Sequence, residues 1–170
     1  MDQITTRTNL LLVEDDADTL EVFSIVLGER YAVSAHRSPL DALRAIDAAR
    51  PDLVVLDIGL QPINGVECLQ KIRATPGYGD VPAVALTGFA RDDDRRRFLA
   101  RGFQAVVVKP ILDPADLMAV IDGLVHRSAA AIGPHRYGPP SAAASGLDGG
   151  EPMPKFAGRA AGQTGGGRPA

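Results

Sequence analysis

The sequence contains little cysteine, no long apolar run and no large excess of positive charge, and each absence excludes a class of protein. The single cysteine, Cys68, provides neither a disulfide framework nor a zinc-binding pattern, so we interpret it as a packing residue. Residues 1–9 are polar, and no apolar run approaches the length of a signal-peptide core or a membrane span, which predicts a cytoplasmic protein with no membrane partner. The net charge is −3, whereas a protein that binds nucleic acid directly usually carries an excess of basic residues, so we expect no direct nucleic-acid binding.

Glycine and proline are unevenly distributed along the chain. Residues 128–170 contain 10 glycines and 6 prolines in 43 positions, with only isolated large apolar residues. Such a segment buries too little apolar surface to offset the entropy lost on ordering, so we expect a disordered tail. Residues 1–127 are long enough to bury one core without help from disulfides or metals, which predicts a single domain there.

Residues 1–127 alternate short apolar runs with helical patterns about five times. This alternation predicts an α/β fold in which five βα units build a parallel sheet. Two helices have clear starts, because Ser38 and Asp113 are N-cap residues followed by proline at the first helical position. Asp18, with Glu21 three residues later, predicts a capping box for the first helix. The remaining boundaries are expected at about residue 27 for the first helix, residues 65–73 for the third and residues 92–101 for the fourth.

Polar residues directly follow four of the apolar runs. Residues 10–13 end in Glu14-Asp15-Asp16, residues 53–56 in Asp57, residues 83–86 in Thr87 and residues 105–108 in Lys109. If these runs are parallel neighbours, their polar groups meet at one edge of the sheet, where open α/β sheets hold their sites. Acids, a hydroxyl and an ammonium group at one edge predict a pocket for a metal ion and a phosphoryl group.

Each part of such a pocket has a candidate residue. Asp57 is the candidate nucleophile, because a carboxylate accepts a phosphoryl group to form an aspartyl phosphate. Glu14 and Asp15 offer the hard oxygen ligands that Mg²⁺ requires. Lys109 provides a compact positive charge for Asp57 or for a phosphoryl oxygen, and Thr87 provides a hydrogen-bond donor.

Taken singly, most of these residues also have a structural explanation. The acidic run at residues 14–16 is equally typical of a helix start, Thr87 of a turn before glycine, and Lys109 of a solvated loop. Asp57 is harder to explain in this way, because an unpaired charge at the end of an apolar strand is costly. The combination of four compatible strand ends favours the functional interpretation.

Four sequence motifs carry these residues: Leu11-Leu12-Val13-Glu14-Asp15-Asp16, Leu56-Asp57-Ile58-Gly59-Leu60 with Asn64-Gly65, Leu86-Thr87-Gly88, and Val108-Lys109-Pro110. They are spaced by 42 residues from Asp15 to Asp57, 30 to Thr87 and 22 to Lys109. In motif and spacing, roughly residues 8–127 resemble the receiver domain of two-component response regulators. The resemblance implies a doubly wound, flavodoxin-like (βα)5 fold, with a five-stranded parallel sheet of strand order 2-1-3-4-5 and the site at its switch point.

By position, the resemblance also implies a role for each site residue. Asp57 is the expected phosphoacceptor, and its expected partners at the phosphoryl group are Thr87 and Lys109. The implied Mg²⁺ ligands are Glu14, Asp15, Asp57 and the carbonyl oxygen of Gly59. Asp16, third in the acidic run, is expected to start a helix and not to bind the metal.

The chain departs from the family pattern at two positions. Three residues before the lysine, the family usually carries tyrosine or phenylalanine, whose ring turns inward on activation; this chain has Val106. Four residues after the phosphoacceptor, the common proline is replaced by Gln61, with Pro62 one residue later. The first departure puts the usual read-out in doubt, whereas neither departure removes a group needed for the chemistry.

The resemblance implies a single-domain response regulator that works in the cytoplasm. Asp57 is expected to accept a phosphoryl group from a phosphohistidine of a histidine kinase or a histidine phosphotransfer protein, with Mg²⁺, within a phosphorelay. The protein then acts as a shuttle, a sink or a partner-binding switch toward a downstream protein, and not as an enzyme in the ordinary sense. Residues 128–170 show no helix-turn-helix pattern, and a chain numbered from Met1 is treated as complete, so output through partners is expected.

Two alternatives belong to other classes. A Mg²⁺-dependent phosphohydrolase that forms an aspartyl phosphate needs a second carboxylate two residues after the nucleophile, where this chain has Gly59. A pseudo-receiver, used only to bind proteins, is disfavoured by the intact acids and Lys109.

Two helices have surfaces that admit two interpretations. Residues 92–97 read Asp-Asp-Asp-Arg-Arg-Arg, which predicts either ion pairs on a solvated helix or a charged docking surface. In the first helix, Val22, Ile25 and Val26 extend the apolar character beyond one face. That helix is either deeply embedded or presents an apolar patch to a partner.

Overall fold

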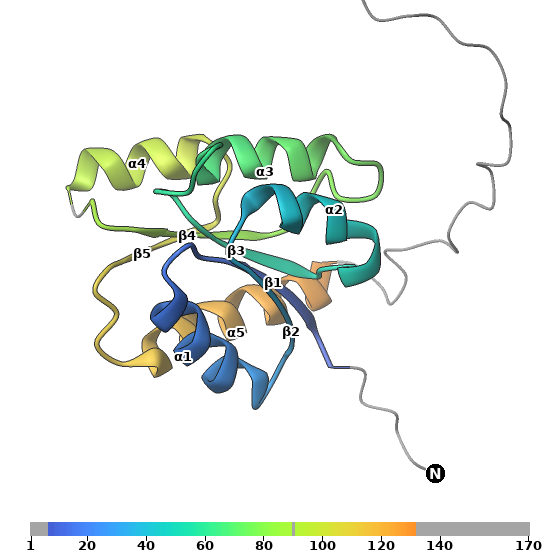
Figure 1. Cartoon of the computed structure of the whole chain (residues 1–170), viewed down its shortest axis with the longest axis horizontal. Coiled ribbons are helices and arrows are strands. Elements are labelled where there is room, and N and C mark those ends of the chain that lie inside the picture. The colour runs from blue at the N-terminus through green and yellow to red at the C-terminus, as the bar shows by residue number, and fades with distance from the viewer. Residues whose placement is uncertain (1–6, 90, 132–170) are drawn as a thin grey trace, which may run out of the picture. The chain divides into compact units, whose positions relative to one another are not determined.

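The computed structural model describes residues 7–89 and 91–131, which form five successive β/α units (Figure 1). The strands are β1 (Asn9–Val13), β2 (Ala32–His36), β3 (Leu53–Asp57), β4 (Ala83–Thr87) and β5 (Ala105–Val108). The helices are α1 (Ala17–Gly28), α2 (Pro39–Ala49), α3 (Gly65–Ala74), α4 (Asp92–Ala100) and α5 (Pro114–Ala131). The predicted alternation of five strands and five helices is confirmed.

The five strands form one parallel sheet in the order β2-β1-β3-β4-β5, as the resemblance implied. In the sheet register, Val13 of β1 lies opposite Leu56 of β3, and Thr87 of β4 lies opposite Val108 of β5. The order reverses direction between β1 and β3, which places the crevice of a doubly wound sheet at the carboxyl ends of these two strands.

Helices cover both faces of the sheet (Figure 1). Helices α2, α3 and α4 pack on one face, and α1 and α5 pack on the other. The residues of β3 alternate between the two sides: Val54 and Leu56 belong to the first core, Leu53 and Val55 to the second. Because both faces are covered, β3 is buried at every position and reads in the sequence as a continuous apolar run.

The predicted starts of α2 and α5 are confirmed. The Ser38 side chain accepts a hydrogen bond from the Leu40 backbone N–H, with Pro39 in the first turn. Asp113 accepts one from the Ala115 N–H at 2.9 Å, and α5 begins at Pro114.

The predicted capping box at the start of α1 is wrong. Asp16, and not Asp18, is the N-cap, because its carboxylate accepts a hydrogen bond from the Thr19 backbone N–H at 2.8 Å. The first helical residue is therefore Ala17. A reciprocal capping box exists instead at α3, where Asn64 and Glu67 each accept a hydrogen bond from the other's backbone N–H.

The predicted helix ends are accurate to one residue for α1, α3 and α4. Helix α5 continues to Ala131, four residues beyond the predicted domain boundary at residue 127. The rest of the predicted disordered tail, residues 132–170, lies outside the described residues.

Among the helices of residues 7–89 and 91–131, none is both long and apolar enough to cross a bilayer. Cys68 is fully buried in the core beneath α3, as expected of a packing residue.

Candidate functional site

All the site residues predicted from the strand ends lie at the carboxyl edge of the sheet. Glu14 follows β1, Asp57 ends β3, Thr87 ends β4 and Lys109 follows β5. Because neighbouring parallel strands are in register, residues up to 95 positions apart in the sequence become neighbours at this edge. The edge is the crevice that the strand order creates.

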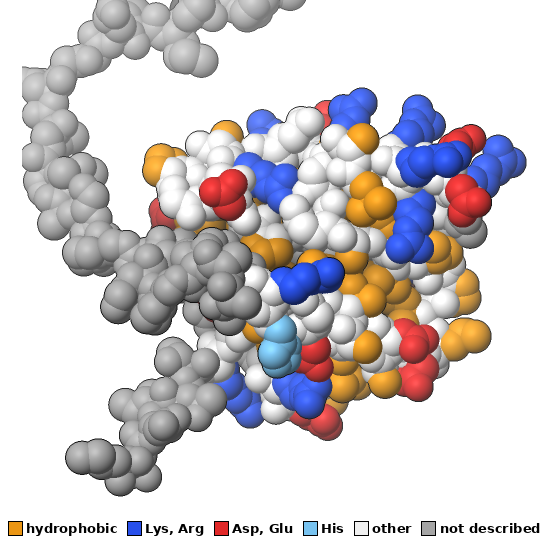
Figure 2. Space-filling model, turned by 180° about the vertical axis from the view of Figure 1, so that it is seen from behind, with side chains coloured by type: hydrophobic (Ala, Val, Ile, Leu, Met, Phe, Trp, Pro, Cys, Tyr) orange, Lys and Arg blue, Asp and Glu red, His pale blue; other side chains and the backbone are white. Residues whose placement is uncertain are grey.

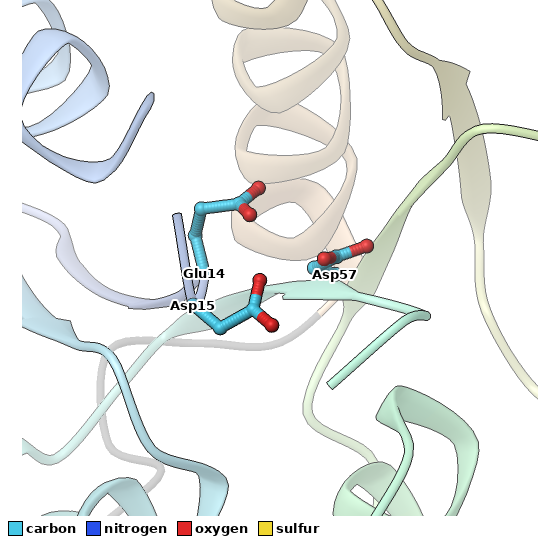
Figure 3. Close-up of side chains that lie close together, drawn as sticks. All are labelled: Glu14, Asp15 and Asp57. Carbon is cyan, nitrogen blue, oxygen red and sulfur yellow. The ribbon is translucent and has the colours of Figure 1, made fainter. Parts of the chain in front are cut away.

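Three carboxylates point toward one another at this edge (Figure 3). Glu14, Asp15 and Asp57 each place an oxygen within 4.8 Å of the others. Glu14 is fully buried, Asp57 is 7% exposed and Asp15 is exposed. Such a cluster of hard oxygen donors, open to solvent on one side, fits Mg²⁺, which keeps several water ligands and takes few carboxylates.

Lys109 neutralises part of this negative charge. Its ammonium group donates a hydrogen bond to the Glu14 carboxylate at 2.7 Å and lies 3.4 Å from Asp57 Oδ2. Burial raises the pKa of Glu14, and the hydrogen bond from Lys109 opposes that rise. Burial acts to lower the pKa of Lys109, but the hydrogen bond and the negative charge of Glu14 outweigh it, so this pKa is raised. The contact with Lys109 therefore favours the charged form of Glu14 against burial, and the raised pKa of Lys109 favours its ammonium form.

The β3–α3 loop fixes the orientation of Asp57. The Gly59 backbone N–H donates a hydrogen bond to Asp57 Oδ1 at 3.1 Å, and Gly59 itself is exposed beside the acids. Gly65, the first residue of α3, packs directly on the backbone of Asp57: a Cβ at Gly65 would lie 2.3 Å from the Asp57 carbonyl oxygen. Any side chain there would push α3 away from β3, so the glycine sets the path of the whole loop.

Thr87 is 1% exposed and is held between backbone groups. Its hydroxyl accepts a hydrogen bond from the Phe89 backbone N–H at 3.1 Å, and its carbonyl accepts one from the Lys109 backbone N–H at 2.7 Å. The hydroxyl still carries its own proton to donate toward the site. Phe89 is 62% exposed.

Asp16 stands apart from the acidic cluster, as predicted. Its carboxylate caps α1, and the hydrogen bonds from Thr19 lower its pKa. Among the described residues, the group of acids close enough to share a metal contains Glu14, Asp15 and Asp57 but not Asp16.

Arg37 is a residue near the site that the sequence did not indicate. It follows β2, and its Nε and Nη2 atoms donate hydrogen bonds to the Asp15 carbonyl oxygen at 3.1 and 3.0 Å. No polar motif marked the end of β2, so this contact was not predictable from the sequence.

The position that usually carries an aromatic ring holds a buried valine. Val106 is 8% exposed and packs in the core on the α4 side of the sheet, opposite Ala85 in the register. The small side chain fills its site without a ring that is able to move between a buried and an exposed position.

The apolar surface of α1 lies beside the site. Val22 and Ile25 are 49% and 64% exposed, whereas Phe23 and Leu27 are buried in the core. A hollow of about 580 Å³ lies between α1 and the loop after β5, lined by Asp18, Thr19, Val22, Phe23, Lys109, Pro110 and Ile111. Of the two interpretations of α1, the exposed apolar patch is the one that agrees with Val22 and Ile25.

Helix α4 carries its charges on a solvated surface. Arg96 pairs with Asp93 and Arg97 with Asp94, each three residues apart, and α4 has no buried residue. Figure 2 shows the basic side chains gathered at the end of the molecule where α4 lies. Ion pairs on an exposed helix, one of the two interpretations, are thus present.

Comparison with known proteins identifies the family. The family model of the response regulator receiver domain matches residues 10–122. The chain is 31% identical over 120 residues to an uncharacterised 14.6 kDa protein of Leptolyngbya boryana, covering 70% of this chain and 91% of that protein. It is 34% identical over 125 residues to the DNA-binding response regulator MtrA of Mycobacterium bovis, covering 73% of this chain and 53% of MtrA. This chain thus spans about half the length of MtrA.

A solved structure agrees with the fold. The chemotaxis response regulator CheY4 of Vibrio cholerae superposes with a TM-score of 0.65 at 23% identity, covering 70% of this chain and 99% of CheY4. At this identity the similarity establishes the fold alone. With a family model matching most of the chain and the five-stranded fold in place, this chain belongs to the response regulator receiver domain family.

Proposed function

We propose that this protein is a phosphoacceptor response regulator, in which Asp57 receives a phosphoryl group from a phosphohistidine of a histidine kinase or a histidine phosphotransfer protein. The single observation that carries the proposal is the environment of Asp57. This carboxylate ends a fully buried strand, lies with Glu14 and Asp15 within 4.8 Å, and has the Lys109 ammonium group 3.4 Å away. A nucleophile, a cation-binding set of oxygens and a fixed positive charge are the parts that phosphoryl transfer needs.

The residues divide the work by their chemistry. The carboxylates of Glu14, Asp15 and Asp57, with the Gly59 carbonyl oxygen, would hold Mg²⁺. When bound, Mg²⁺ neutralises charge that develops on the phosphoryl oxygens. The Gly59 N–H hydrogen bond orients Asp57 Oδ1, and Asp57 Oδ2, which lies 3.4 Å from the Lys109 ammonium group, would attack phosphorus.

The transfer itself exchanges one bond to phosphorus for another. An Asp57 oxygen forms the new O–P bond as the P–N bond to the donor imidazole breaks, and the imidazole nitrogen leaves with the electron pair. Lys109 pairs with one phosphoryl oxygen, and the Thr87 hydroxyl donates a hydrogen bond to another. The group is later lost when water or a second histidine attacks phosphorus and the Asp57 carboxylate leaves.

The surface next to the site suits a helical donor protein. The exposed Val22 and Ile25 on α1 form an apolar patch, and the hollow beside it reaches Lys109. A donor helix packed on this patch would bring its phosphohistidine to the mouth of the pocket. We place the protein in the cytoplasm, where a phosphohistidine made from ATP is available.

We further propose that output runs through protein partners, with the protein acting as a shuttle, a sink or a partner-binding switch. The described residues contain the receiver fold alone, and the Leptolyngbya boryana relative is of similar length to that fold. MtrA, by contrast, is a DNA-binding response regulator of nearly twice this matched length. The absence of an aromatic ring at Val106 favours a shuttle or sink, because a usual source of the distal switch is missing.

The proposal is tested by incubating the full chain with Mg²⁺ and a small phosphodonor, followed by intact-mass measurement. We expect one added phosphoryl group on the wild type, none without Mg²⁺, and none on Asp57→Asn. Asp52 precedes β3 at the amino ends of the strands, away from the acidic cluster, so Asp52→Asn serves as the matched control and should be labelled. A folded wild type that takes no phosphoryl group from this donor or from a histidine kinase would make the chain a pseudo-receiver. Labelling of Asp57→Asn equal to wild type would refute the phosphoacceptor assignment.

A further inference from the structure

Arg37 joins the end of β2 to the loop that carries Asp15. The two loops run side by side, because the Glu14 backbone N–H donates a hydrogen bond to the His36 carbonyl oxygen at 3.1 Å. Arg37 follows His36, and its guanidinium reaches across to the other loop, where Nε and Nη2 donate hydrogen bonds to the Asp15 carbonyl oxygen. Two donors of one planar group on a single oxygen restrict the orientation of that peptide more than one flexible donor does.

Asp15 differs from its two acidic neighbours, Glu14 and Asp16, in that its side chain is neither buried in an ion pair nor used to cap a helix. Glu14 is buried and paired with Lys109, and Asp16 is committed to the cap of α1. Asp15 lies between them in a short loop outside any helix or strand, with an exposed side chain. Arg37 is the side chain that the structure records on the Asp15 carbonyl oxygen.

We propose that Arg37 is a positioning residue, which holds the Asp15 peptide so that the Asp15 carboxylate faces Glu14 and Asp57 and is ready to bind a divalent cation. This inference rests on the proposed function, since it concerns the same Mg²⁺ site. Groups that orient a ligand from outside the coordination sphere commonly change metal affinity by about tenfold or more when they are removed.

The sign of the effect separates positioning from simple electrostatics. A guanidinium near an acidic cluster repels a divalent cation, so removing its charge would strengthen Mg²⁺ binding if charge were its only contribution. Removing a positioning contact weakens binding instead. Arg37→Lys separates the two contributions further, because lysine keeps the charge but cannot reproduce the planar, two-donor contact.

Arg7 is a matched control within the same chain. It is also exposed, and it also donates two hydrogen bonds to backbone carbonyl oxygens, those of Gly28 and Glu29, at 3.2 and 3.1 Å. These contacts precede β1, at the edge of the sheet opposite the acids. Arg7→Gln therefore changes the net charge by the same amount as Arg37→Gln and removes a similar pair of hydrogen bonds, but it leaves the Asp15 loop intact.

The experiment is a calorimetric titration of the full chain with MgCl₂, because the sequence has no tryptophan to report binding. We expect Arg37→Gln to raise the Mg²⁺ Kd by about tenfold and Arg37→Lys to raise it at least as much, while Arg7→Gln leaves it unchanged. With a small phosphodonor, the slower phosphorylation of Arg37→Gln should recover at saturating Mg²⁺, since the chemical groups are unaltered. Thermal unfolding of the variants checks that all remain folded.

The outcomes that contradict the proposal are distinct. If Arg37→Gln binds Mg²⁺ as tightly as wild type or more tightly, Arg37 does not position Asp15, although the proposed function stands. If Arg7→Gln weakens binding as much as Arg37→Gln, the effect is a general loss of structure and the specific role is wrong. If the wild type neither binds Mg²⁺ nor takes up a phosphoryl group, the proposed function fails, and the role of Arg37 fails with it.

Discussion

Lys109 lies closer to Glu14 than to Asp57: its ammonium nitrogen is 2.7 Å from the Glu14 carboxylate and 3.4 Å from that of Asp57. Glu14 is fully buried, whereas the Lys109 side chain is 26% exposed. A buried carboxylate without a partner is costly, so the lysine compensates Glu14 before any phosphoryl group arrives. Lys109 therefore has a structural role in the unphosphorylated protein as well as its proposed role at the phosphoryl group.

Lys109→Ala is expected to lower the free energy of unfolding by roughly 3 kcal/mol, because it leaves the Glu14 charge buried and unpaired. Without Lys109, burial and the negative charge of Asp57 raise the pKa of Glu14, and only the hydrogen bond from the Asp16 backbone N–H lowers it, so this pKa in the folded state rises further above the ordinary value of 4.5. The folded variant then binds more protons than the unfolded chain above that pH, and its stability should fall as the pH rises. Urea unfolding at several pH values measures this. Adding Glu14→Gln should restore part of the loss, and a double variant no more stable than Lys109→Ala would contradict the explanation.

Asp15→Ala and Asp16→Ala are adjacent changes with different expected results. Asp15→Ala, like Glu14→Ala, should weaken Mg²⁺ binding and slow phosphorylation, because each removes an oxygen from the cluster. Asp16→Ala should leave both nearly intact and instead destabilise the protein through the lost helix cap. Calorimetric titration with Mg²⁺ and urea unfolding of the three variants compare these effects. Equal losses of Mg²⁺ affinity in all of them would show that the cluster is misassigned.

Phe89→Ala is expected to shorten the lifetime of the phosphoprotein. The Phe89 backbone is hydrogen-bonded to the Thr87 hydroxyl, and its ring is 62% exposed, so the ring is available to hinder the water that attacks the aspartyl phosphate. The decay of the phosphorylated protein is followed by intact mass. Leu112→Ala, which removes an exposed side chain 89% open to solvent, is the control. Decay of Phe89→Ala at the wild-type rate would rule out shielding by the ring.

Val106 predicts a weak distal response to phosphorylation. Valine is stiff at χ1 and small, so it cannot repeat the movement of a ring between buried and exposed positions. Adding a beryllofluoride mimic should therefore shift amide NMR signals strongly around Asp57 and little across residues 92–108 and 113–125. Equally large shifts in both regions would mean that another residue drives the switch and that the shuttle interpretation is wrong.

The thiol of Cys68 should be unreactive while the protein is folded. Burial raises its pKa to about 11, so very little thiolate is present at about pH 8, and the side chain is inaccessible in the core. A thiol reagent should modify the native protein far more slowly than the urea-unfolded chain. Rapid modification of the native protein would indicate that the core beneath α3 opens easily.

The strand ends were predictable because parallel strands that are buried on both faces appear in the sequence as continuous apolar runs. Strand β3 is buried throughout, so a carboxylate at its end is conspicuous. Strand β2 lies at the edge of the sheet and is half exposed, with only Val33 as a large apolar residue, so its end was not marked as part of the site and the contact of Arg37 beyond it was not predicted. The resemblance correctly placed Asp16 at the start of α1, whereas the capping box assigned to Asp18 from local spacing was wrong, because several nearby acids can each cap a helix and only the fold decides which one does.

The site brings together Glu14 and Lys109, which are 95 residues apart in the sequence, and no shorter stretch of the chain contains it. The unfolded chain therefore has no such site, and any ligand that binds here binds the folded form alone. By mass action, such a ligand raises the free energy of unfolding by about 2.7 kcal/mol when its free concentration is about 100 times its Kd. The melting temperature of this protein should thus depend on the Mg²⁺ concentration, so that the cation acts on the folding equilibrium of the whole domain as well as on phosphoryl transfer.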